Sequence, residues 1–235
     1  MINKFTLLFI MVCISGYTFA TTPEELLTAV DQNSSLVTDI RYDMVTTRTV
    51  NTRTTTVTSR YYYKSPNRTR TENSDGSGLM MVKQDTKIRI KDLKSGGVRE
   101  IPTAANISNG SNYVSYLSMY DITTTAVTDS VYTLQCLPKN VDPNISKIVM
   151  IVDNSKNMIN EITKYDNDNN IIYHLVNGDP QLINSIWCVL SCVTEENIII
   201  RKPNNQLPEI NSMRTELHYS NVYINAGVDE NLFTF

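Results

Sequence analysis

The sequence predicts a mainly β protein of the α+β class, with about ten or more strands in one largely sequential antiparallel arrangement. From Asp39 onward, apolar residues recur at every second position in short segments that turn-forming residues separate. Only one clear amphipathic helix precedes these segments. Since a sheet of this size must hide one apolar face, it must close on itself, pair with a second sheet or curve around a cavity.

Residues 1–20 have the three parts of a secretory signal peptide. A positive charge at Lys4 is followed by an apolar run over residues 5–14 and a polar stretch that ends at Ala20. The run is shorter than the roughly 20 apolar residues that span a membrane, which disfavours an uncleaved anchor. Cys13 raises the alternative of a lipoprotein, but Val12 stands where a small residue is expected. We expect cleavage between Ala20 and Thr21, and one domain over residues 21–235.

The charge and the histidines disfavour several kinds of partner and ligand, and the cysteines leave two alternatives open. A formal net charge of −3 without a basic cluster argues against nucleic acid or an anionic membrane surface as the main partner. Because His174 and His218 are isolated, we expect no metal site, and we expect no cofactor. Cys136, Cys188 and Cys192 follow the leader. In an extended strand Cys188 and Cys192 lie about 13 Å apart, so a disulfide needs a turn or bulge, and buried free thiols are the alternative.

The first element expected is a helix of about three turns that fades near residues 33–35. Thr22 and Glu25 have capping-box spacing, and Pro23 occupies the first helical position. The apolar side of this helix consists of Leu26, Leu27 and Val30.

Strands follow, with a hairpin turn near residues 50–52 and a strong turn signal at 166–170. Residues 102–118 break the alternation, and we expect an irregular or helical insertion there, with Tyr113, Tyr116, Leu117 and Tyr120 near helical spacing. Flexible methionines suit a cavity for varied apolar ligands, although core filling is the alternative. The methionines concerned are Met44, Met80, Met81, Met119, Met150, Met158 and Met213.

Several segments appear in an order that resembles the outer membrane lipoprotein-sorting proteins of the LolA type. They extend over nearly the whole chain after the leader. The segments are residues 62–70, 132–134 with 138–139, 148–153, 162–166 and 225–233.

This resemblance implies an incomplete antiparallel β-barrel of about 10 to 11 strands, with helices covering its concave face over an apolar hollow. It implies a periplasmic, monomeric carrier without enzymatic activity that sequesters acyl chains of lipoproteins or other envelope lipids. Handover proteins in the inner and outer membranes would then be partners. Arg41 and Arg48 are candidates for an arginine that ties the lid to the barrel. The residues expected to line the hollow are Tyr42, Met44, Tyr61, Tyr63, Met80, Val82, Leu117 and Trp187.

Two other functions stay open on the sequence alone. The first is an envelope-sensing module that resembles the lipid-binding half of MucB-type regulators and controls a membrane partner. The second is an enzyme, which the absence of a G-x-S-x-G motif or a metal-ligand cluster disfavours. Sequons at Asn33, Asn67, Asn106, Asn109 and Asn144 would suit glycosylation, but chance explains them better in a chain rich in Asn, Ser and Thr. The sequence leaves the identity of the cargo open.

Overall fold

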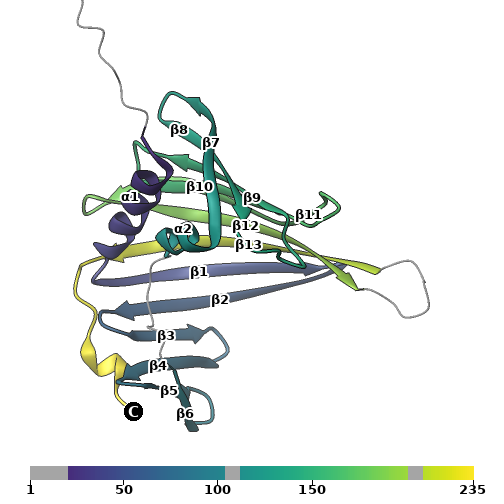
Figure 1. Ribbon diagram of the computed structural model, residues 1–235. Coiled ribbons are helices and arrows are strands. Elements are labelled where there is room, and N and C mark those ends of the chain that lie inside the picture. Colours follow the sequence, from purple (N-terminus) through teal and green to yellow (C-terminus); the bar gives the residue numbers. More distant parts are fainter. Residues whose placement is uncertain (1–20, 104–111, 201–208) are drawn as a thin grey trace, which may run out of the picture.

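The structure is a computed structural model that describes residues 21–103, 112–200 and 209–235. The expected signal peptide, residues 1–20, therefore lies outside the described residues, and of the expected cleavage site only Thr21 is described. None of the described helices has the length and hydropathy needed to cross a membrane. The elements labelled in Figure 1 or named below are α1 (Pro23–Ser35), β1 (Asp39–Val50), β2 (Arg53–Lys64), β3 (Arg68–Asn73), β4 (Gly78–Gln84), β5 (Lys87–Asp92), β6 (Val98–Pro102), η1 (Tyr113–Ser115), α2 (Tyr116–Met119), β7 (Tyr120–Thr128), β8 (Val131–Pro138), β9 (Lys147–Asp153), β10 (Met158–Tyr165), β11 (Ile171–Ile183), β12 (Ile186–Ile200), β13 (Glu209–Ile224) and η2 (Glu230–Phe233).

The strands form one antiparallel sheet in the order β6-β5-β4-β3-β2-β1-β13-β12-β11-β10-β9-β8-β7. Strands that follow one another in the chain are neighbours within each arm of the sheet, and β13 returns to pair with β1 and join the two arms. The edges β6 and β7 do not pair, so the sheet is curved but open (Figure 1). The mainly β class and the antiparallel half-barrel are confirmed.

The expected number of about 10 to 11 strands was too low, because the described sheet has 13. The sequence analysis missed β7, whose apolar residues are sparse among threonines and whose edge position leaves most of it exposed. The expected hairpin turn at residues 166–170 is present, with the Asp166 amide donating to the Asn170 carbonyl at 3.0 Å. Asn169 adopts a φ of 64°, a left-handed conformation that asparagine tolerates better than most residues.

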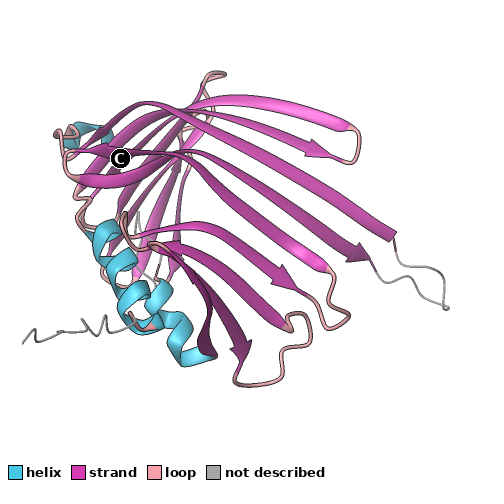
Figure 2. Cartoon of the chain, turned by 90° about the horizontal axis from the view of Figure 1, so that it is seen from above, coloured by secondary structure: helices cyan, strands magenta, loops and turns pink. Residues whose placement is uncertain are grey.

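Helix α1 begins as the sequence predicts. The Glu25 amide donates to the Thr22 hydroxyl at 3.2 Å, while the Thr22 amide donates to the Glu25 carboxylate at 2.7 Å. Its apolar side is buried against strands β8–β10, where Leu134 and Met150 are fully buried. Figure 2 shows α1 on the inner side of the curved sheet, across one end of the strands. We call the sheet face that carries α1, η1 and α2 the inner face, and the opposite one the outer face.

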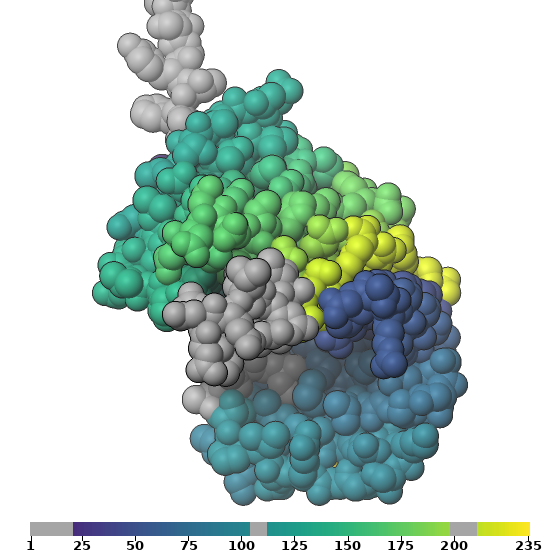
Figure 3. All heavy atoms as spheres, turned by 90° about the vertical axis from the view of Figure 1, so that its right-hand side faces the viewer, coloured from purple at the N-terminus to yellow at the C-terminus, as the bar shows by residue number. Residues whose placement is uncertain are grey.

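A second apolar cluster lies on the outer face. Val228 and Phe233, from the segment around η2, cover Tyr62, Met80 and Val82 of β2 and β4. The Lys64 ammonium donates to the Val228 carbonyl at 2.8 Å and helps to hold this segment in place. Figure 3 shows the end of the molecule opposite α1, where the β1–β2 hairpin stands between the teal-green arm of β7–β11 and the blue arm of β3–β6.

Candidate lipid-binding cavity

A cavity of about 280 Å³ lies between α1 and the inner face of the sheet. We call it the α1 cavity. Its described lining combines apolar side chains with tyrosines, asparagines, a serine and a cysteine, and includes no Asp, Glu, Lys, Arg or His. The lining residues are Val30, Asn33, Ser34, Val37, Ile40, Tyr42, Tyr113, Asn157, Met158, Ile159, Asn177, Ile186, Trp187, Cys188, Val189, Tyr219, Val222 and Ile224.

The tyrosines beside the α1 cavity form an aromatic group that stays uncharged at neutral pH. Tyr42 stacks on Tyr61 with ring centroids 4.9 Å apart and meets the edge of Tyr219 at 5.1 Å. Burial raises the pKa of Tyr61 and of Tyr219 to about 12 and lifts the pKa of Tyr42 well above its ordinary value. An apolar chain in the cavity therefore meets neutral rings.

Two amide side chains of the lining have hydrogen-bond partners in the backbone. Asn33 of α1 donates to the Trp187 carbonyl at 2.9 Å, and Asn177 of β11 donates to the Ile159 carbonyl at 2.9 Å. The first bond ties α1 to β12, beside the cavity. Satisfied amides add less polarity to a cavity than free ones, because their donors are already engaged.

The helices above the cavity are also tied to each other. The Asp31 carboxylate on α1 accepts the backbone amides of Tyr113 at 2.9 Å and of Val114 at 2.8 Å. Because these amides begin η1, the carboxylate caps that short helix and couples it to α1. We call α1, η1 and α2 together the lid. The Asp31 side chain joins α1 to η1, and α2 follows η1 directly in the chain.

An Asp31→Asn variant is expected to lose one of these two bonds, because its amide group offers a single acceptor oxygen. The expected cost is about 1 to 2 kcal/mol of unfolding free energy, with faster hydrogen exchange at the amides of Tyr113 and Val114. Denaturant unfolding and amide-resolved exchange measure both effects. Asp121→Asn on the exposed strand β7 is the matched control, and equal exchange in the two variants would refute the coupling.

The structure places the expected lining residues in three locations. Tyr42 and Trp187 line the α1 cavity, while Tyr61 and Tyr63 pack in the cluster beside it on the same face. Met44 is half-buried on that face, opposite Tyr219, and Leu117 packs from α2 against the core beneath α1. Binding of lipid by these residues stays a prediction.

Met80 and Val82 were placed in the hollow by the sequence analysis, and the structure places them elsewhere. The register pairs Tyr63 with Thr69 and Thr69 with Met81, so Met81 shares the inner face with Tyr63. Met80 and Val82 therefore lie on the outer face, buried under the C-terminal segment. Of the methionines considered, Met158 lines the α1 cavity.

Sequence reasoning missed the part of the lining that the last strand supplies. Val222 and Ile224 of β13 come next to Ile40 of β1 through pairing between the two ends of the described domain. Their alternation in the sequence was the available signal. Val30 and Val37 were visible as apolar residues in and after the expected helix, and the structure turns both toward the cavity.

Among the residues that the structure describes, neither candidate arginine ties the lid to the sheet. Arg41 lies on the outer face, with its guanidinium carbon 4.2 Å from the centroid of the Tyr223 ring. Arg48 lies near the far end of β1, where its Nε donates to the sulfur of Met213 at 2.9 Å. Polar ties between the described lid and the sheet come instead from Asn33, which donates to the Trp187 carbonyl at 2.9 Å, and from Lys139 after β8, whose ammonium donates to the Leu117 carbonyl at 2.7 Å.

The three described cysteines, Cys136, Cys188 and Cys192, are free thiols. Burial raises the pKa of Cys136 to about 12 and also raises the pKa of Cys188 and of Cys192. They are protonated at neutral pH, which agrees with a packing role.

An open antiparallel half-barrel with a helix laid across its inner face defines the architectural class of this protein. This fold is similar to that of solved proteins of the LolA superfamily. A LolA superfamily protein from Nitrosomonas europaea aligns over 92% of this chain and 99% of its own, with 10% identity and a TM-score of 0.55. A domain from Vibrio parahaemolyticus named for outer membrane lipoprotein sorting aligns over 88% of this chain and 95% of its own, with 13% identity and a TM-score of 0.56.

A DUF1329 family protein from Desulfovibrio piger has a TM-score of 0.59, with 17% identity over 90% of this chain and 95% of its own. No family model matches the sequence, and no curated protein matches it. At these identities the likeness establishes the fold.

Proposed function

We propose that this protein is a periplasmic carrier that binds acyl chains of lipoproteins, or of other envelope lipids, and hands them toward the outer membrane. The observation that carries the proposal is an uncharged cavity between α1 and an open β-sheet. The cavity sits where a helix of only 13 residues meets the sheet. A helix of this length is marginal alone, so its position depends on packing and can change when a ligand enters.

The energetics suit a carrier that must also release its cargo. Burying a chain of about 16 methylenes is worth roughly 13 kcal/mol at most, nearly what the same chain gains in a bilayer. A carrier therefore needs only to match the membrane closely, and small changes in lid packing then decide the direction of transfer. The proposal includes membrane handover partners and a monomeric carrier, and it assigns no catalytic step.

The cavity also limits how much of a chain it can take. Its volume of about 280 Å³ lies just below the range of about 300 to 1,000 Å³ that is typical of small-molecule sites. The α1 cavity therefore suits one part of an acyl chain. The remainder must lie along the open inner face.

Trp187 provides a direct test, because it is the one tryptophan of the chain and lines the cavity. Titration with palmitate is expected to shift its fluorescence and to saturate, and native mass spectrometry of protein from its own cells is expected to show an added lipid mass. An unchanged spectrum together with an unloaded mass would reject the carrier. Co-purification of a membrane-anchored regulator in place of lipid would favour the sensing module.

A further inference from the structure

The inner face changes character along the strands that lead away from the α1 cavity. Next to the cavity, Met44 pairs with Tyr219, and one step further Leu217 pairs with Cys192. The following row is polar, because Arg48 pairs with Thr215 and Thr215 with Thr194. Apolar side chains thus give way to hydroxyls and a guanidinium on one continuous face.

Arg48 retains hydrogen-bonding capacity in this row. It is exposed, and its Nε contacts the sulfur of Met213, a weak acceptor. Among the described residues it forms no ion pair. Its remaining N–H groups can form the paired hydrogen bonds that suit a carboxylate or phosphate.

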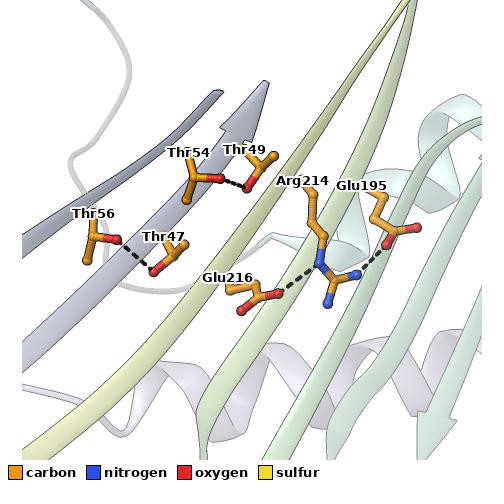
Figure 4. A network of polar contacts seen from close by, with 7 residues as sticks. All are labelled: Thr47, Thr49, Thr54, Thr56, Glu195, Arg214 and Glu216. Carbon is orange, nitrogen blue, oxygen red and sulfur yellow. Dashed lines mark hydrogen bonds and ion pairs between the residues drawn. The ribbon is translucent and has the colours of Figure 1, made fainter. Parts of the chain in front are cut away.

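The outer face directly behind this row is different. There Arg214 is held between Glu195 and Glu216, and threonine hydroxyls pair across β1 and β2, as Figure 4 shows. Arg214 therefore has its charge compensated on both sides. Of these two neighbouring arginines, Arg48 is the one available to an anion.

The spacing between the α1 cavity and Arg48 is close to the length of one acyl chain together with its head group. Arg48 lies six positions after Tyr42 along β1, a distance of about 20 Å. An acyl chain spans half of a bilayer core that is about 30 Å thick, or about 15 Å. A chain of this length whose end lies beside Tyr42 covers about three quarters of the distance to Arg48, and its head group extends it toward the polar row.

We propose that Arg48, with the hydroxyls of Thr194 and Thr215, forms the head-group subsite for an amphiphile with an anionic head, a carboxylate or a phosphate. The inference rests on the proposed function, since the chain of the same ligand occupies the α1 cavity. It defines the ligand class further, because it selects anionic amphiphiles over uncharged ones of equal chain length.

The test is an Arg48→Gln variant titrated with palmitate, lysophosphatidylglycerol and uncharged monopalmitoylglycerol, with Trp187 fluorescence as the readout. Affinity for the two anionic probes is expected to fall about fivefold, as an exposed ion pair allows, with affinity for the uncharged probe unchanged. Arg41→Gln removes the same charge from the outer face and is expected to bind all three probes as the unmodified protein does.

The outcomes separate this subsite from the carrier function. If the unmodified protein binds none of the probes, the carrier function itself fails. If it binds them and Arg48→Gln binds each with unchanged affinity, or loses affinity for all three equally, the head-group subsite is overturned. A loss confined to palmitate identifies a carboxylate head, and a loss confined to lysophosphatidylglycerol identifies a phosphate head.

Discussion

A Val222→Asp variant is expected to bind palmitate at least about 100-fold more weakly than the unmodified protein, because an acyl chain laid over a carboxylate must strip it of water. Val222 is half-buried, lines the α1 cavity and packs beside Ile40 and Ile224. No charge is present in the described lining, so the introduced carboxylate finds no partner there. Fluorescence titration through Trp187 measures the loss.

Val45→Asp is the matched control for this prediction. Val45 lies on the outer face of β1 with 36% of its surface exposed, so the same substitution there leaves the cavity untouched. We expect it to bind palmitate normally. Val222→Phe, which fills the hollow without adding charge, is expected to weaken binding as well. Normal affinity in a folded Val222→Asp variant would show that the chain binds elsewhere.

A Leu27→Ala variant is expected to lose about 3 kcal/mol of unfolding free energy, which is the largest stability effect that we predict. Leu27 is fully buried between α1 and strands β8–β10, where it packs with Leu134 and Met150. Because α1 is too short to be stable alone, the cavity left at Leu27 also loosens the whole helix from the sheet. Urea unfolding followed by Trp187 fluorescence measures the loss. The comparison requires that the unfolding free energy falls with urea concentration at the same rate in both proteins.

Leu36→Ala controls for the change of residue type. Leu36 follows the same helix but is 55% exposed, so its loss is expected to change the unfolding free energy by less than about 0.5 kcal/mol. If the two variants were equally stable, the packing of α1 would contribute little to the fold. The lid would then owe its position to its hydrogen bonds alone.

The local elements could be predicted because their signals are local. The capping box that begins α1 spans four residues, and the turn at residues 166–170 needs only its own Asp and Asn side chains. Strand β7 was missed because its local signal is weak. At the edge of the sheet it has one pairing neighbour, so its sequence carries little of the apolar alternation that marks a buried strand.

The candidate site was predicted less completely, because its residues meet through pairing between distant parts of the chain. Tyr42 and Trp187 were found from their character, whereas Val222 and Ile224 required the pairing of β1 with β13. Met80 and Met81 show that a difference of one position in the sequence decides which face of the sheet a residue occupies. They are adjacent in sequence and lie on opposite faces, because a strand turns successive side chains to opposite sides.

The sequence by itself determined the helix, most strands and their antiparallel order, since periodicity and turn chemistry act over a few residues. Only the tertiary structure decided which face of each strand borders the hollow, which side chains tie the lid and where Arg48 stands relative to the cavity. The physical reason is that the alternation of side chains along a strand separates two faces but does not determine which of them borders the hollow. That choice is made by cross-strand register and by the curvature of the whole sheet.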